Sequence, residues 1–306
     1  MFESVSIIRL RVARNSHACF AMLAALLFCA MIFTGCKPAE RTQNEPHDNT
    51  PQRIVSMSPG VTEIMFFLGE QHRLVGRTDH CNFPAEAADI PSIGGFGQPS
   101  VERIVALRPD LILTTNSSAH PSFAKLQSLN MNVRNIETQS LDDVFAMILE
   151  IGKMLDVETK AKKRVDALRA QVNAVRARHK NETHALRTYV EIDYSPIFTV
   201  GSEGFLNDML DILGAENIFH DINQGYPQVG AEAVILRDPE IIFLGHGTYG
   251  GNALEKVRAR TGWSGIAAVR KGRVYGDLNP DLYHRPSPRL VDGLLEMEKR
   301  IYGEAE

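Results

Sequence analysis

The chain has 306 residues, of which 44% are hydrophobic and 23% charged. It is too apolar for a disordered protein and long enough for two lobes. Its 33 lysines and arginines stand against 37 aspartates and glutamates, which gives a formal net charge of -4 and a pI near 6.2. This balance provides no basic field for counterion release, so nucleic acid is excluded as an expected partner.

Residues 1–35 have the pattern of a bacterial lipoprotein signal peptide. Arginines near the start precede an uncharged apolar run over residues 18–34, and Cys36 follows a glycine. We therefore expect residues 1–35 to be removed, Cys36 to carry the lipid and residues 36–52 to form a flexible tether. The alternative is an uncleaved membrane anchor, for which the run is at the short edge of the roughly 17 to 25 residues that span a bilayer.

The chain contains four cysteines. Cys19 and Cys29 would leave with the signal peptide and Cys36 would be lipidated, so Cys81 remains as the lone thiol of the mature protein. No intrachain disulfide is then expected. A lone cysteine in an oxidising compartment is either buried and inert or close to a functional site.

From Arg53 onward, short apolar runs alternate with helical patterns. Ser58 and Ser100 are placed as helix N-caps, the first of them followed by a proline at the first helical position. Such alternation predicts the βα units of a parallel sheet. The expected strands are residues 53–57, 74–76 and 111–113, and the expected helices are residues 59–68 and 101–107.

The segment from Ser100 to Leu113 reappears, with its apolar positions in step, from Gly230 to Phe243. Glu102 falls on Glu232 in this alignment. A second, weaker echo relates residues 62–69 to residues 207–214. Two echoes in the same order indicate two lobes of like fold rather than a chance similarity between βα units.

Two helical segments lie between the echoes, an amphipathic one over residues 141–155 and a longer one over residues 158–180. A single long helix between lobes acts as a stiff strut and predicts small lobe movements. The expected fold class is α/β, with two Rossmann-like lobes of parallel sheet joined by a single long inter-lobe helix. The expected division is an N-terminal lobe at 53–155, the inter-lobe helix at 156–181 and a C-terminal lobe at 182–306.

The chain from Arg53 to about Tyr302 resembles the periplasmic substrate-binding proteins of ABC importers that use a helical backbone. Within that class it resembles the cobalamin (corrinoid) receptors. Segments 53–59 and 101–110 are shared by many receptors of the class, whereas the 226–229 stretch and the loop before Phe83-Pro84 are more particular to cobalamin receptors. The segments that carry the resemblance are Arg53-Ile-Val-Ser-Met-Ser-Pro59, Asn82-Phe-Pro84, Val101-Glu-Arg-Ile-Val-Ala-Leu-Arg-Pro-Asp110, Gly214-Ala-Glu-Asn-Ile-Phe219, Tyr226-Pro-Gln-Val229 and Ser287-Pro-Arg289.

Ligands of such folds lie against the loops that follow the carboxyl ends of the strands. Here those loops hold aromatic residues between glycines, which suits a corrin, a broad and partly apolar disc with amides at its rim. The resemblance implies aromatic walls at Phe96 and Tyr226, and we expect Asp281 to accept from rim amides. The predicted ligand-binding residues are His80, Phe83, Phe96, Tyr194, Tyr226, His246 and Asp281.

The role of His80 stays open between two interpretations. It aligns with a cleft aromatic of the similar receptors, and a neutral imidazole is a good cobalt ligand. Alternatively, His80 packs in the site or bonds a rim amide of the corrin.

The resemblance also implies the partners. Similar receptors use glutamates matching Glu102 and Glu232 to meet arginines of the permease, although an early helical glutamate also favours the helix dipole. The expected protein is a monomeric, extracytoplasmic or periplasmic lipoprotein that is bound to the membrane through its lipid and delivers a corrinoid to an ABC permease and ATPase complex. The corrinoid is the transported ligand, and no cofactor or resident metal is expected.

Particular residues bear on three alternative functions, an enzyme, a metal-ion receptor and a haem or ferric-siderophore receptor. Catalytic motifs are missing from the sequence, so an enzyme is not expected, although His80, His246 and His284 could converge as zinc ligands of a metal-dependent hydrolase. A receptor for free metal ions is less favoured because the chain lacks a His-rich acidic loop. The main alternative is a haem or ferric-siderophore receptor, for which Arg285 is the one cleft arginine and Arg77 is interpreted as structural.

Overall fold

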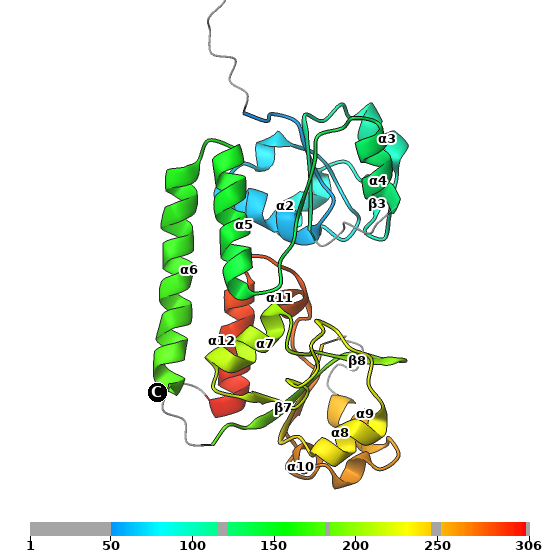
Figure 1. Cartoon of the computed structure of the whole chain (residues 1–306), viewed down its shortest axis with the longest axis vertical. Helices are drawn as coiled ribbons and strands as arrows, with labels where there is room; N and C mark the ends of the chain where they lie inside the picture. The colour runs from blue at the N-terminus through cyan, green and yellow to red at the C-terminus, as the bar shows by residue number, and fades with distance from the viewer. Residues whose placement is uncertain (1–49, 116–120, 181–183, 246–251, 304–306) are drawn as a thin grey trace, which may run out of the picture. The chain divides into compact units, whose positions relative to one another are not determined.

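The computed structural model describes residues 50–115, 121–180, 184–245 and 252–303, all within one compact unit, Thr50–Glu306 (Figure 1). The predicted signal peptide and Cys36 lie outside these residues. In the described ranges, no helix combines the length and the apolar character of a membrane-spanning segment.

The first lobe is built on a four-stranded sheet in the order β2-β1-β5-β6, with every pair parallel. β1 and β5 are buried throughout, as parallel strands are when helices cover both faces. The predicted strands are confirmed as β1, β2 and β5. The elements of this lobe are β1 (Ile54–Ser56), α2 (Pro59–Leu68), β2 (Leu74–Arg77), β3 (Gly94–Gly95), β4 (Gln98–Pro99), α3 (Val101–Ala106), β5 (Leu111–Thr115), α4 (Pro121–Ser128) and β6 (Val133–Ile136).

The second lobe is built on a five-stranded sheet in the order β11-β10-β7-β8, with β9 also paired to β7. Its strands are parallel except β8, which turns back antiparallel to β7. The sequence pattern does not indicate that this edge strand is antiparallel. The elements of this lobe are β7 (Arg187–Tyr194), β8 (Ile197–Thr199), α7 (Phe205–Ile212), β9 (Glu216–Asn217), α8 (Ala231–Arg237), β10 (Ile241–Leu244), α9 (Ala253–Arg258), α10 (Ala267–Arg270), β11 (Val274–Tyr275), α11 (Asp281–His284) and α12 (Leu290–Tyr302).

The two sequence echoes fold alike in detail. Arg108 and Asp238, which correspond in the alignment, both adopt positive φ angles, of 48° and 41°. An arginine at the start of the neighbouring strand bonds each of them. The Nε atom of Arg53 donates to the carbonyl of Arg108 at 3.2 Å, and that of Arg187 donates to the carbonyl of Asp238, also at 3.2 Å. The second lobe thus repeats the local chain path of the first.

Two helices connect the sheets, α5 (Leu141–Met154) and the 22-residue α6 (Glu158–His179). They pack closely, because a Cβ atom placed on Gly152 of α5 would lie 2.4 Å from the Cβ of Ala161 on α6. The buried positions of α6 recur at intervals of three and four residues, the spacing of one helical face. They are Ala161, Val165, Leu168, Val172 and Val175.

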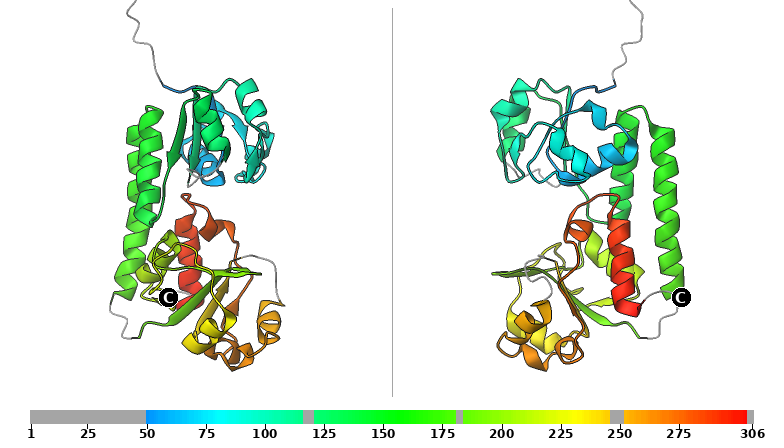
Figure 2. Two further views of the ribbon diagram at one scale, coloured as in Figure 1. Left: turned by 45° about the vertical axis from the view of Figure 1, so that its right-hand side comes forward. Right: turned by 180° about the vertical axis from the view of Figure 1, so that it is seen from behind.

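One hydrophobic core runs through both lobes. It extends from Ile54 and Leu113 of the first sheet, through α5 and α6, to Val190 and Phe243 of the second. α12 contacts α6 along the same flank (Figure 2). α5 and α6 therefore contribute to a core that connects the two lobes, which supports the interpretation of the long helix as a stiff strut.

An ion pair fastens α12 to the end of α6. Glu298 accepts from Arg178 in a bidentate arrangement, at 2.8 and 2.7 Å, and lies 2.7 Å from Nε2 of His179. The side chain of Glu298 is 8% exposed. The hydrogen bonds from Arg178, more than those from His179, hold the pKa of Glu298 below its usual range despite burial.

We expect Glu298→Gln to lower the free energy of unfolding by about 1.5 to 3 kcal/mol at neutral pH, the range for hydrogen bonds to charged groups. Because the folded state lowers this pKa, the contribution is complete above the unfolded-state value, near 4.5, and is lost as the pH falls through the folded-state value. Urea denaturation of both proteins at several pH values measures the difference. A difference that does not shrink on acidification would contradict the assignment.

Candidate functional site

Four of the predicted ligand-binding residues are aromatic and exposed, three of them on loops and Tyr194 at the end of β7. Seven large hydrophobic side chains are exposed in the described ranges, and these four are the aromatic ones among them. The four are Phe83 at 42%, Phe96 at 43%, Tyr194 at 46% and Tyr226 at 45%.

Phe96 and His80 lie together. Phe96 is at the turn of the β3–β4 hairpin, which begins at Gly94 with a φ of 107°, a conformation that favours glycine. The backbone N–H of Phe96 donates to Nδ1 of His80 at 3.4 Å. A neutral imidazole that accepts at Nδ1 carries its proton on Nε2. This hydrogen bond leaves Nε2 of His80 as the ring nitrogen that is not bonded to Phe96.

Tyr226 sits on a loop that packs against the segment after β8. The N–H of Gly201 donates to the carbonyl of Gly225 at 3.1 Å, and that of Thr199 to the carbonyl of Pro227 at 3.0 Å. A Cβ atom on Gly201 would lie 2.2 Å from the carbonyl oxygen of Gln224, so a larger residue has no room there. Desolvation raises the pKa of Tyr226 to about 12, so the hydroxyl stays a neutral donor at physiological pH.

Tyr194 ends β7, beside an arginine that the sequence analysis did not single out. The guanidinium carbon of Arg260 lies 5.9 Å from the centre of the Tyr194 ring. Arg260 is held by both carboxylate oxygens of Glu191, at 2.6 and 2.7 Å, and Glu191 is fully buried. Arg260 and Glu191 are 69 positions apart in the sequence, so no local pattern connects them.

Phe83 and Asp281 meet arginines from the segment before α12. The guanidinium carbon of Arg289 lies 3.7 Å from the centre of the Phe83 ring. Asp281, the first residue of α11, pairs with Arg285 at 2.8 Å. One carboxylate oxygen of Asp281 is therefore already engaged by the protein.

Arg285 was the one cleft arginine considered for an anionic chelate. Its guanidinium pairs with Glu63 at 3.2 Å as well as with Asp281, and its side chain is 12% exposed. This pairing counts against Arg285 as a free partner for an anionic ligand. Arg77 donates to the carbonyls of Thr78, Ala87 and Ala88, at 3.0 to 3.1 Å, so its structural interpretation is confirmed.

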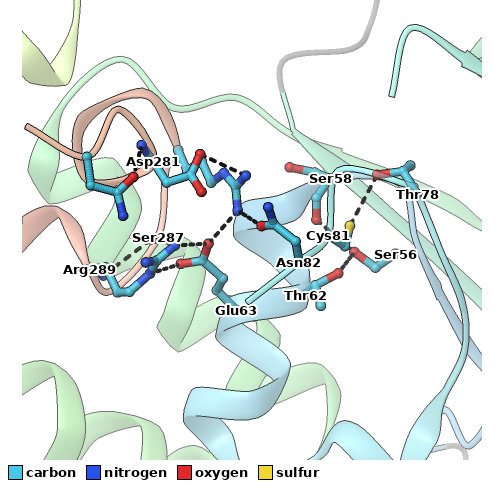
Figure 3. A network of polar contacts seen from close by, with 12 residues as sticks. Ser56, Ser58, Thr62, Glu63, Thr78, Cys81, Asn82, Asp281, Ser287 and Arg289 are labelled. Carbon is cyan, nitrogen blue, oxygen red and sulfur yellow. Dashed lines mark hydrogen bonds and ion pairs between the residues drawn. The ribbon is translucent and has the colours of Figure 1, made fainter. Parts of the chain in front are cut away.

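The remaining candidates divide between buried and undescribed residues. Cys81 is buried, with Sγ 3.2 Å from the Thr78 hydroxyl (Figure 3), although it follows His80 of the candidate site in the chain. His246 lies outside the described residues. Among the residues that the structure does describe, no cluster of three or more histidine, cysteine or acidic side chains is arranged to hold a metal ion.

The glutamates predicted for docking occupy matching places. Glu102 is the second residue of α3 and Glu232 the second residue of α8, and both are exposed. Hydrogen bonds from its own backbone and from the Ser100 hydroxyl lower the pKa of Glu102. Each glutamate has an exposed apolar neighbour one helical turn later, Val105 at 41% and Leu236 at 87% exposure.

Comparison with known proteins gives relatives over nearly the whole chain. The ABC transporter substrate-binding lipoprotein YvrC of Bacillus subtilis (strain 168) is 31% identical over 307 residues, covering 91% of this chain and 96% of the relative. The vitamin B12-binding protein of Vibrio parahaemolyticus serotype O3:K6 (strain RIMD 2210633) is 27% identical over 257 residues, covering 83% and 89%.

Solved structures share the fold. A possible iron-binding (periplasmic solute-binding) protein from Staphylococcus epidermidis ATCC 12228 matches with a TM-score of 0.73 and 28% identity, covering 83% of this chain and 99% of that one. The periplasmic vitamin B12 binding protein BtuF of Vibrio cholerae matches at 0.72 and 24%, covering 82% and 97%. A periplasmic heme binding protein from Pseudomonas aeruginosa matches at 0.73 and 24%, covering 84% and 94%.

The two-lobed α/β fold with its long connecting helix agrees with these structures. The relatives are binding proteins of transport systems, which implies a small-molecule ligand and an importer composed of a permease and an ATPase. The model of the periplasmic binding protein family matches residues 54–279. The chain belongs to this family, as a relative of ABC transporter substrate-binding lipoproteins and vitamin B12-binding proteins.

Proposed function

We propose that this protein captures a corrinoid between its two lobes and delivers it to an ABC permease. The observation that carries the proposal is the set of four exposed aromatic residues, three on loops of the two lobes and Tyr194 at the end of β7. Flat apolar side chains suit the faces of a corrin, and the tyrosine hydroxyls suit the amides at its rim. Relatives named as vitamin B12-binding proteins support this ligand class.

The aromatic rings can supply a large part of the free energy of tight binding. Covering about half of a 150 to 250 Å² aromatic side chain, at about 25 cal/mol per Å², contributes about 2 to 3 kcal/mol per ring. Four such rings contribute about 8 to 12 kcal/mol before the entropy of binding is subtracted. A nanomolar complex requires about 12 kcal/mol, so hydrogen bonds at the rim and the rest of the ligand contact supply the remainder.

A haem or ferric-siderophore receptor is the alternative, because solved haem-binding and possible iron-binding proteins share the fold at similar scores. Haem propionates and most ferric chelates carry negative charge and favour a free arginine in the site. Both Arg285 and Arg289 are paired with carboxylates. These pairings favour a ligand without concentrated negative charge, as a corrinoid is.

Absorbance titration distinguishes these ligands. The purified protein is offered cyanocobalamin, haemin and a ferric siderophore in separate titrations, because each ligand has its own visible spectrum. Saturable binding of cyanocobalamin at submicromolar concentration is expected. Saturable binding of haemin or of the siderophore, without binding of any corrinoid, would replace the proposal with its alternative.

We further propose that residues 1–35 are a signal peptide and that Cys36 holds the mature protein to a membrane, facing the extracytoplasmic space. Residues 53–155 and 182–306 then form the lobes of the working monomer, with residues 156–181 between them. We expect Cys36→Ser to leave the precursor unprocessed or to release the protein from membranes. Fractionation and intact mass measure both effects, and unchanged values for the variant would contradict lipidation.

A further inference from the structure

Glu63 of α2 is a buried carboxylate at the centre of a polar network that joins the two lobes. Its side chain is 2% exposed. Arg289 donates through Nε to one carboxylate oxygen at 2.8 Å and through Nη2 to the other at 2.7 Å (Figure 3). Arg285 also donates to Glu63, at 3.2 Å. A buried carboxylate with two guanidinium partners has a fixed position, because leaving any of these charges unpaired is unfavourable.

The two arginines also reach residues of the proposed ligand site. Arg289 covers one face of the Phe83 ring at 3.7 Å from the ring centre, and 42% of Phe83 remains exposed. Arg285 donates to the side-chain oxygen of Asn82 at 2.7 Å and pairs with Asp281. Phe83 and Asn82 come from the first lobe, whereas both arginines come from the second.

The backbone around the arginines is fitted to α2. A Cβ atom on Gly60, in the first turn of α2, would lie 2.3 Å from the carbonyl oxygen of Pro286. Ser287 is 1% exposed, and its hydroxyl accepts from the backbone N–H of Arg289 at 3.2 Å. The network is thus assembled on closely packed backbone rather than on free side chains.

We infer that Glu63 and Arg289 are positioning residues of the ligand site. Glu63 fixes the guanidinium of Arg289, and Arg289 holds the Phe83 ring in the orientation that receives the ligand. This inference rests on the proposed function. A side chain that is already immobilised loses less entropy when the ligand binds, and such preorganisation raises affinity without a direct contact to the ligand.

The test is a set of cyanocobalamin titrations, well below the unfolding temperature, with wild type, Glu63→Gln, Arg289→Met, Phe83→Leu and the double variant Arg289→Met/Phe83→Leu. Glu63→Gln and Arg289→Met should each weaken binding about three- to tenfold. In the Phe83→Leu background, Arg289→Met should change affinity by less than about twofold, because the ring through which it acts is gone. If the Arg289→Met variant does not fold, Arg289→Lys takes its place in this set of variants. Lysine keeps the positive charge but loses the bidentate contact with Glu63.

Glu298→Gln is the matched control. It also removes a carboxylate held by a bidentate arginine, but on α12 against α6, so it should lower stability and leave affinity unchanged. The inference is overturned if wild type and Arg289→Met bind equally, or if the loss persists undiminished in the Phe83→Leu background. If wild type binds haemin and no corrinoid, the proposed function has failed, and the same cycle with haemin decides the positioning role.

Discussion

Alanine at Phe96 or at Tyr226 is expected to weaken corrinoid binding at least tenfold. Each ring would lose about 2 to 3 kcal/mol of apolar contact with the ligand, and tenfold in affinity corresponds to about 1.4 kcal/mol. The two rings lie on different lobes, Phe96 at the β3–β4 turn and Tyr226 in the loop after β9.

Leu129 provides the control for this experiment. It is a large hydrophobic residue exposed to a similar extent, at 45%. It lies between α4 and β6, at the amino ends of the parallel strands, whereas the predicted ligand loops follow the carboxyl ends. Leu129→Ala should leave affinity unchanged in isothermal titration calorimetry. Equal binding by wild type and both aromatic variants would contradict the assignment of Phe96 and Tyr226 as walls.

The local elements could be predicted because their signals are local. The hydroxyl of Ser100 accepts from the N–H of Arg103, and Gly69 ends α2 in the left-handed conformation, as their positions in the sequence indicate. Ser58 is the exception. It occupies the N-cap of α2, but its hydroxyl bonds the hydroxyl of Thr115 and makes no cap hydrogen bond. A partner 57 residues away cannot be inferred from the helix signal.

The same contrast applies to the site. Aromatic residues between glycines, such as Phe96, stand out in the sequence because no core needs them. The pairing of Glu63 with Arg289 does not stand out in the sequence, because 226 residues separate the two. A glutamate in an apolar helix and an arginine after Ser-Pro each allow several surface roles. Only the tertiary fold brings them to one buried network, so the sequence does not single out Glu63, and it marks Arg289 only as part of a segment that carries the family resemblance.

Replacing both Glu102 and Glu232 with alanine is expected to abolish uptake of the ligand and to leave its binding intact. The two carboxylates occupy equivalent places on the two lobes, and each has an exposed apolar side chain one turn away, Val105 or Leu236. An acidic residue beside an exposed apolar one suits a partner surface that carries arginines, where charge pairs set the register of docking. Leu236, at 87% exposure, leaves an apolar side chain available for contact with such a partner.

The competing explanation is that both glutamates only stabilise the starts of their helices. The bond from Ser100 to Glu102, at 3.0 Å, is consistent with that role. The double variant Glu158→Ala/Glu255→Ala separates the two explanations, because it removes one exposed first-turn glutamate from each of two other helices, α6 and α9. Both double variants lose the same charge and similar helix-dipole stabilisation of about 0.3 to 1 kcal/mol per residue. Transport in reconstituted vesicles should therefore fail only for Glu102→Ala/Glu232→Ala, whereas survival of uptake, or a parallel fall in ligand affinity, would assign these glutamates to helix stability or to the ligand site.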